Sequence, residues 1–575
     1  MRLYINLSVL LQLSMTFVSS VVWSQEKIDY NKLQSEEVNL QTNGAVFLSG
    51  ETVYISAFSF LGSSSRPSPL SKILYVTLVD DAGEEVNFQK IAMNKGRGNG
   101  DLFLGTSLKT GHYKLIAYTR WMLNFGKQHF FEKDLILINP YRTREADKPY
   151  SDYPEYLENI SFQEMTSPYL SVALDKSILK PRQPLNIELK TQGKDALSGS
   201  YALSVRKIDS LDFVKMQSSV ELKWNFNQNL NTDSLLAPEL RGALVSGKLN
   251  FPVNNEGKEN RTVVLSFVDV DRTPEFALTD DEGRFTWVLE ELPTSRQTMG
   301  VAIGVENVCD FEIFEDPRPE YSDLTFKRIG IDRDLKNLIE RRSVANQIEN
   351  AYYQFKPDTI IETPKIRPFY IDAGKTFILG NFTRFNTLKE TFTEIIQGGA
   401  VRIRNGEPVF KVETSNFIQG NEEYPTLLLV DGILVTNHKF LYNYPSKNIE
   451  RITVVPEEYY LGPQRFSGIL DIHSFDADFK RQYLLQASEA LSINPVALQK
   501  KYFNQQYGGT DTESLSKIPD YRYQLLWKPL VSLQNDEASF NCYTSDVTGI
   551  FEVVVSGFTG SGQPVFVKSF FEVTN

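Results

Sequence analysis

The sequence predicts a mainly β, multidomain protein that combines β-sandwiches with a small α/β domain and an amphipathic helical linker. The chain has 575 residues, and because one hydrophobic core serves roughly 150 residues, this length predicts about four domains. Short runs of alternating apolar residues recur along the chain, as in residues 52–57, where Val53, Ile55 and Ala57 share one face. The aromatic content of 12% also favours β structure.

Residues 1–24 have the layout of a secretory signal peptide, with Arg2, an apolar run and the small residue Ser24. A membrane anchor is the alternative, but Ser and Gln interrupt the run. No later segment approaches the ~20 unbroken apolar residues of a spanning helix, so we expect an exported protein without a transmembrane segment after cleavage. The net charge of −12 argues against nucleic acid as a partner, since neutralising phosphates requires a basic surface.

Three β-sandwiches are expected in the first 320 residues. The first covers residues 25–142 and the second covers residues 165–238, which strands from the C-terminus could complete. The third covers residues 239–320 and contains the turn "TDDEGRF", in which Asp281 to Gly283 supply local hydrogen bonds and a permissive backbone.

Residues 321–363 are expected to form a helical linker. Their apolar side chains fall near helical spacing, and Pro357 ends the run. The residues at this spacing are Leu335, Leu338, Ile339, Ile348, Tyr352 and Phe355. We expect the neighbouring pair Arg341 and Arg342 to lie on the solvated face of this helix.

Residues 364–478 mix helix and strand and are predicted to form the small α/β domain. Its stretch "YPTLLLVDGILV" (424–435) predicts an antiparallel hairpin, because Asp431 and Gly432 can supply the positive φ angles of a tight two-residue turn. We expect both residues to form the structural turn rather than to contact a ligand. Residues 479–575 are expected to hold a helix around 481–503, followed by a C-terminal sandwich.

The sequence carries no catalytic, cofactor-binding or metal-binding motif, so we expect a protein that is not an enzyme and has no cofactor. The four histidines have no paired metal spacing, and no nucleophile elbow is present. Cys309 and Cys542 either form one disulfide or are two separately buried thiols. The tryptophans are either sugar-stacking platforms or core residues; those considered are Trp121, Trp224, Trp287 and Trp527.

Several stretches resemble the macroglobulin-type, immunoglobulin-like sandwiches of alpha-2-macroglobulin-like proteins. These are "LQTNGAVFLSGETVYISAF" with "LKTGHYKLIAYTRWM", then "ALDKSILKPRQPLNIEL", and the C-terminal "LLWKPLVSL". The third sandwich is similar to transthyretin-like or carboxypeptidase-regulatory-like domains. Covalent protease traps of the macroglobulin family carry a thioester in a "GCGEQ" context, whereas Cys309 precedes "DFEI" and Cys542 precedes "YTSD". The resemblance therefore implies a macroglobulin-like protein without a thioester.

Another set of phrases resembles, in order and spacing, the plug domain of TonB-dependent outer-membrane receptors. The phrases are "FTEIIQGGAVRIRNGEP", "YPTLLLVDGILV" and "NIERITVVPEEYYLGPQRFSGILDIHS". A receptor barrel needs many strands of ~10 residues after the plug, whereas only residues 479–575 follow here. The whole is similar to a Gram-negative envelope family that joins macroglobulin-like sandwiches to a barrel-less plug.

These resemblances imply a non-catalytic envelope protein that is outer-membrane-associated, periplasmic or at the cell surface. Its plug-like domain is expected to dock onto an outer-membrane β-barrel protein or a transport complex. Two alternatives stay open. One is a thioester-less protease-binding protein with a bait loop between residues 305 and 365, and the other is a glycan-binding accessory protein.

Overall fold

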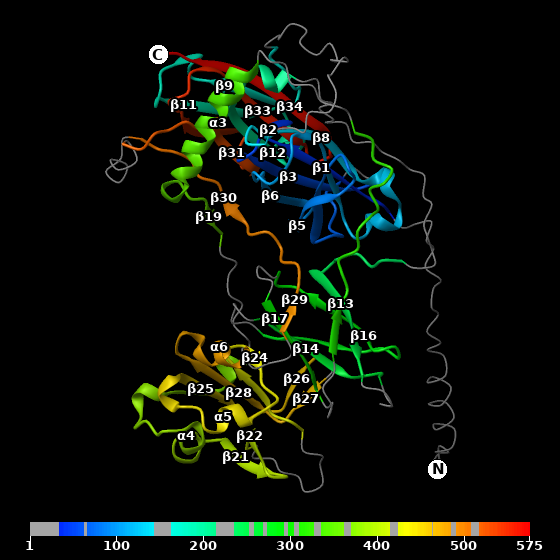
Figure 1. Cartoon of the computed structure of the whole chain (residues 1–575), viewed down its shortest axis with the longest axis vertical. Helices are drawn as coiled ribbons and strands as arrows, with labels where there is room; N and C mark the ends of the chain where they lie inside the picture. The colour runs from blue at the N-terminus through cyan, green and yellow to red at the C-terminus, as the bar shows by residue number, and fades with distance from the viewer. Residues whose placement is uncertain are drawn as a thin grey trace, which may run out of the picture.

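The computed structural model shows an elongated molecule that is mainly β, as the sequence predicted (Figure 1). One lobe holds two β-sandwiches and the long helix α3 (Lys336–Ala351), and the other holds a third sandwich and an α/β domain. The structure describes residues 34–62, 66–142, 163–213, 235–251, 258–267, 273–292, 297–303, 310–326, 335–361, 370–413, 424–462, 464–484, 490–507 and 517–575. The predicted signal peptide lies outside these residues.

The first sandwich consists of two sheets joined by the hairpin between β5 and β6. One sheet contains β1 (Glu36–Thr42), β3 (Thr52–Leu61) and β6 (Arg97–Phe103); the other contains β5 (Glu85–Asn94), β4 (Ile73–Val79), β7 (Gly111–Tyr118), β8 (Phe131–Ile138) and β2 (Val46–Leu48). Val53, Ile55 and Ala57 of β3 are fully buried, in agreement with the alternating pattern. The opposite face of β3 is not solvated, because the hydroxyl of Ser56 donates to the carbonyl of Pro529 in the second sandwich.

The second sandwich is discontinuous in sequence. Its first part supplies β9 (Leu170–Leu174), β10 (Ile178–Leu179), β11 (Pro184–Thr191), α2 (Lys194–Leu197) and β12 (Ser200–Lys207). Its second part supplies β31 (Gln524–Val531), β32 (Glu537–Tyr543), β33 (Gly549–Phe558) and β34 (Pro564–Val573). Because β12 lies between β33 and β31, and β11 lies between β32 and β9, neither part forms a complete sheet without the other.

The third sandwich also contains a strand from far along the chain. One sheet has the order β16 (Arg284–Leu289), β13 (Ala243–Asn250), β18 (Asp310–Ile313), and the other β15 (Glu275–Leu278), β14 (Thr262–Phe267), β17 (Gln297–Ile303), β29 (Ala490–Ser492). The helix expected around 481–503 is therefore wrong over residues 490–503, where the chain is extended or irregular; α6 (Asp478–Leu484) covers its start, and residues 485–489 lie outside the described residues. Pro495 is unfavourable inside a helix, and the extended chain instead buries Ile493 and Val496 in a core shared by the first and third sandwiches.

The α/β domain, which comprises the described residues between 370 and 484, has a mixed five-stranded sheet. The strand order is β20 (Lys375–Ile378), β25 (Ile449–Val455), β28 (Ile469–Ser474), β23 (Leu427–Val430), β24 (Ile433–Leu434). Around it lie α4 (Leu388–Glu394), α5 (Lys439–Tyr442), α6 and the hairpins β21 (Gly399–Arg404) to β22 (Glu407–Val412) and β26 (Tyr459–Leu461) to β27 (Gln464–Phe466). Thr387 and Glu390 form a capping box that starts α4.

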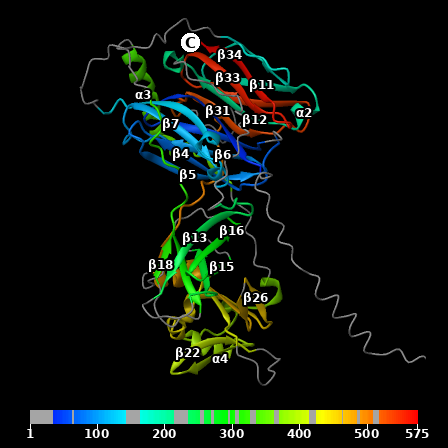
Figure 2. The same cartoon turned by 90° about the vertical axis from the view of Figure 1, so that its right-hand side faces the viewer.

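The α/β domain is fixed to the third sandwich by a common core. Met299 and Val301 of β17 belong to the same buried cluster as the sheet of the α/β domain. The amide of Leu434 in β24 also donates to the hydroxyl of Ser266 at 3.2 Å. Figure 2 shows this domain at the end of the molecule away from the two paired sandwiches. Shared cores thus hold the domain at the tip of a rod of sandwiches.

Candidate functional site

The predicted turn in the α/β domain is a two-residue hairpin with positive φ at both central residues, 51° at Asp431 and 79° at Gly432. Asp431 has a second role that the sequence did not indicate. Its buried carboxylate accepts hydrogen bonds from the amide and hydroxyl of Ser474, at 2.7 and 2.6 Å, and from the amide of Lys480 at 3.3 Å. Burial raises the pKa of this carboxyl group, although the bonds from Ser474 oppose that effect. Asp431 therefore ties the turn to the end of β28 and the start of α6.

The two cysteines do not define a site. Cys542 is a free thiol in β32 and is completely buried in the core of the second sandwich. Burial raises its pKa to about 12, so the unreactive thiol form dominates. Cys309 lies outside the described residues, and its pairing with Cys542 stays a prediction.

The tryptophans that the structure describes are core residues rather than sugar platforms. Trp121, Trp287 and Trp527 are all buried, and Trp287 donates its indole N–H to the carbonyl of Val263 at 3.1 Å. Trp224 lies outside the described residues. A glycan-binding role would therefore need other aromatic side chains.

No metal-binding cluster is present within the described residues, where no three His, Cys, Asp or Glu side chains are grouped to hold an ion. Two of the four histidines lie beside carboxylates: His112 contacts Asp134 at 2.9 Å and His473 contacts Asp471 at 3.1 Å. His438 accepts a hydrogen bond from the amide of Phe410 at 2.9 Å, and burial lowers its pKa to about 4. Within the described residues, no helix is both long and apolar enough to cross a membrane.

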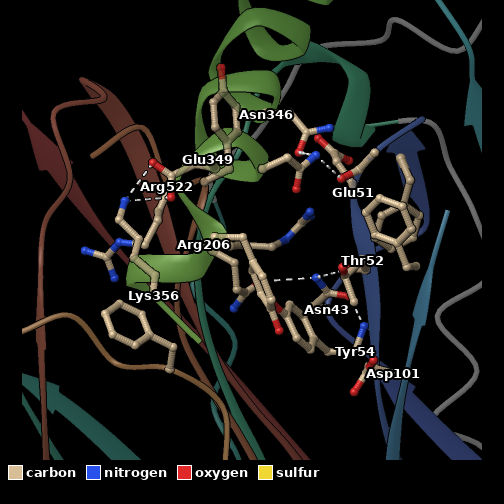
Figure 3. A pocket seen from close by; sticks show the side chains of 18 of the residues that line it. Asn43, Glu51, Thr52, Tyr54, Asp101, Arg206, Asn346, Glu349, Lys356 and Arg522 are labelled. Carbon is tan, nitrogen blue, oxygen red and sulfur yellow. Dashed lines mark hydrogen bonds and ion pairs between the residues drawn. The ribbon is translucent and has the colours of Figure 1, made fainter. Parts of the chain in front are cut away.

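A cleft of about 570 Å³ lies between the two sandwiches and α3 (Lys336–Ala351) (Figure 3). We call it the intersandwich cleft. Its walls come from β3 and β6 of the first sandwich, from β12 and β31 of the second, from α3, and from β30 (Lys500–Lys501), which pairs with β19 (Thr359–Ile360). Figure 3 shows Glu349, Lys356 and Arg522 on one side of the cavity, and Glu51, Thr52 and Asp101 on the other.

Arg342 of α3 joins the two sandwiches at this cleft. Its side chain is 5% exposed and forms ion pairs with Glu51 of the first sandwich at 2.6 Å and with Asp209, which follows β12, at 3.4 Å. It also donates to the carbonyl of Val46 at 3.2 Å. The expectation that Arg342 lies on a solvated face is therefore wrong, whereas its neighbour Arg341 is exposed. A charge this deeply buried needs such partners, because an unpaired one costs several kcal/mol.

Two carboxamides of α3 continue this contact. Asn346 donates to the carbonyl of Ser49 at 3.1 Å, and Asn350 donates to the carbonyl of Gly50 at 3.0 Å. Gly50 has a φ of 91°, and a Cβ atom there would lie 2.7 Å from the amide nitrogen of Asn346. Glycine is thus required both for the backbone conformation and for the close approach of α3.

A buried charge network forms the opposite wall. Lys356 pairs with Glu349 at 2.8 Å and with Asp520 at 3.5 Å, and Arg522 holds Asp520 by two bonds of 2.7 Å. Burial alone would raise the pKa of Asp520, but Arg522 and Lys356 outweigh it and lower that pKa to about 2. Asp520 therefore stays charged over the physiological pH range, whereas burial raises the pKa of Glu349.

Comparisons with known proteins give structural neighbours only, since no protein-family model and no curated protein matches the sequence. The native conformation of Escherichia coli alpha-2-macroglobulin matches 94% of this chain and 40% of its own, with 9% identity and a TM-score of 0.24. Salmonella alpha-2-macroglobulin reacted with methylamine matches 94% and 39%, with 9% identity and a TM-score of 0.24. The E. coli adhesin FdeC matches 49% and 64%, with 10% identity and a TM-score of 0.15.

The neighbours are thus bacterial macroglobulins and adhesins. The chain spans about 40% of the length of those macroglobulins. The macroglobulin-like identity of the sandwiches and the plug-like identity of the α/β domain both stay predictions.

Sequence reasoning did not find the intersandwich cleft. Its lining residues come from stretches that are hundreds of positions apart, such as Glu51, Arg206, Arg342 and Arg522. One signal was available: the adjacent arginines of α3 follow apolar residues at helical spacing, and Arg342 lies three positions after the buried residue Ile339. That spacing places Arg342 on the buried side of the helix.

Proposed function

We propose that this protein is a non-catalytic exported envelope protein whose rod of β-sandwiches presents the α/β domain to an outer-membrane β-barrel protein or transport complex. The proposal combines the plug-like phrases of the sequence with the position of the domain at the end of the molecule. A domain held rigidly by a shared core loses little conformational freedom when it binds, which favours docking.

The observation that carries the proposal is the free edge of the α/β sheet. β24 is at one edge and contacts the third sandwich through Ser266. β20 is at the other edge, and among the described strands it pairs with β25 alone. An unpaired strand edge offers backbone donors and acceptors to a partner strand, and natural proteins usually protect such edges.

Exposed apolar side chains gather beside this edge. Ile378 of β20 is 52% exposed and lies opposite Arg451, which in turn lies opposite His473. Phe475, two residues after His473, is 46% exposed. Phe382 is 43% exposed and packs against Phe377 of β20, with ring centroids 6.3 Å apart. Ile378 on the free edge and Phe382 and Phe475 on neighbouring segments are therefore three exposed apolar side chains in this region, which we call the apolar corner.

The protease-binding alternative is less well supported by the described residues. Its predicted bait loop between 305 and 365 contains β18, α3 and β19. β18 pairs with β13, and β19 pairs with β30. α3 packs on the two sandwiches. In the described part of this stretch, the chain is thus engaged by other elements rather than presented as a free loop.

The docking proposal is tested by binding of the purified chain to outer-membrane vesicles. We expect saturable binding that the substitutions Ile378→Asp and Phe475→Asp weaken at least about tenfold, because they place charges in an apolar contact. Ile178→Asp is the matched control, since Ile178 is 64% exposed but lies in the second sandwich. Equal binding of all variants would show that the apolar corner is not the docking surface. No saturable binding at all would contradict the docking proposal itself.

A further inference from the structure

The intersandwich cleft has the size and rigidity of a preformed ligand site. Its volume of about 570 Å³ falls within the roughly 300–1,000 Å³ of small-molecule sites. The ion pairs of Arg342, Lys356 and Arg522 fix its walls before any ligand enters. A further ion pair, between Lys500 and Asp101 at 2.9 Å, fixes the side formed by β30. A ligand would therefore meet walls that are already ordered, which lowers the cost of binding.

The acidic groups of the cleft are already engaged. Glu51, Glu349 and Asp101 are each paired with a cation of the wall. Asp358, the remaining lining carboxylate, accepts a hydrogen bond from the amide of Phe503 at 2.9 Å. These carboxylates therefore hold the wall together.

Lys207 at the end of β12 is different. Its ammonium is half-buried, lies 5.1 Å from the ring centroid of Tyr523, and has no carboxylate within ion-pair distance among the described residues. Burial lowers its pKa; the carboxylate of Asp209 opposes this shift from beyond ion-pair distance, and the arginines Arg341 and Arg342 add to it. A half-buried cation in this position is stabilised by an incoming anion.

Exposed aromatic rings complete the lining. Phe103 is 56% exposed, Tyr353 is 53% exposed and Tyr521 is 38% exposed, and all three line the cleft. Phe103 lies at the end of β6, Tyr353 follows α3, and Tyr521 precedes β31, so the rings come from three different walls. Flat aromatic faces stack on the apolar faces of sugar rings, and the tyrosine hydroxyls add hydrogen bonds.

We propose that the intersandwich cleft binds a short saccharide that carries a carboxylate, with the carboxylate at Lys207 and the sugar faces on Phe103, Tyr353 and Tyr521. The ligand class follows from what the described lining leaves free, which is one cation and several aromatic rings. A polyacidic peptide offers carboxylates but no sugar faces for the three aromatic rings. A neutral saccharide would leave the ammonium of Lys207 without a counter-charge.

The test is calorimetric titration of the full chain with trigalacturonate, with maltotriose as the neutral saccharide and triglutamate as the acidic peptide. We expect trigalacturonate to bind at least about tenfold more tightly than either other probe. We also expect its affinity to fall as salt is raised, because the contact with Lys207 is partly exposed. No saturable binding of trigalacturonate, or equal or tighter binding of maltotriose or triglutamate, would overturn the proposal.

Two variants assign the binding to this cleft. Lys207→Met keeps the apolar stem against Tyr523 and should weaken trigalacturonate binding at least about tenfold. Phe103→Ala removes an exposed ring, so it should weaken binding without affecting the fold. The matched control is Lys248→Met, because Lys248 is also half-buried but lies on β13 of the third sandwich. Unchanged affinity in both cleft variants, or an equal loss in the control, would contradict the assignment.

Discussion

Replacing Arg342 with methionine should loosen the two-sandwich lobe, because the buried guanidinium of this residue joins α3 to both sandwiches. The variant keeps most of the apolar stem of the side chain but removes the ion pairs to Glu51 and Asp209 and the bond to the carbonyl of Val46. Removing one partner of a buried ion pair costs about 3–5 kcal/mol, since the remaining charges stay buried without compensation. Glu51 keeps the hydrogen bond from the amide of Leu48 at 2.9 Å and is 15% exposed. We therefore expect the lower end of this range, about 3 kcal/mol.

Hydrogen exchange followed by mass spectrometry measures this effect locally. A loss of about 3 kcal/mol corresponds to roughly a hundredfold faster exchange, which we expect in β2, in residues 49–51 and in α3, provided that these amides exchange by local opening. Arg341→Met is the matched control, because Arg341 is exposed on the same helix and surface substitutions usually change stability by less than about 0.5 kcal/mol. Equal protection in the two variants would refute the role assigned to Arg342.

Three further predictions concern single residues. Burial raises the pKa of Glu239, which accepts from the hydroxyl of Tyr75 at 3.1 Å, to about 7. Between about pH 4.5 and 7 the folded state holds a proton that the unfolded state has released, so the free energy of unfolding should fall by about 3 kcal/mol as the pH rises across this range. Urea titrations of Glu239→Gln should lack this pH dependence, and an unchanged pH dependence would refute the assignment. Asp431→Asn keeps the turn but loses acceptors for Ser474 and Lys480, so thermal unfolding should show a loss of about 1–3 kcal/mol, and no loss would limit Asp431 to turn formation. Cys542 should react with iodoacetamide only on unfolding, and rapid labelling of the native chain at this residue would contradict its burial.

The alternation of apolar residues and the turn residues in the sequence predicted strands and a tight hairpin, and two examples show why. Val53, Ile55 and Ala57 alternate and are buried, because a strand with one core face leaves a period of two in the sequence. Asp431 and Gly432 adopt positive φ, because few residue pairs tolerate that geometry. These features depend on neighbours in the chain, which a sequence displays directly.

The features that position the cleft depend on distant partners. Ser200 lies opposite Phe558 in the second sandwich, and Gln297 lies opposite Ser492 in the third. No local periodicity indicates pairings over such separations. The same limit explains the error at Arg342: two adjacent arginines suggested a solvated face, because Glu51 and Asp209, the ion-pair partners of Arg342, are far away in sequence.

Site-specific photocrosslinking in native envelopes tests the central claim of docking most directly. A photoreactive amino acid at Ile378, on the free edge of the α/β sheet, should crosslink to a heat-modifiable outer-membrane β-barrel protein. The same amino acid at Ile178, which is 64% exposed in the second sandwich, should not. A barrel adduct from position 378 alone is the predicted result. No barrel adduct from position 378, or equal adducts from both positions, would contradict the account.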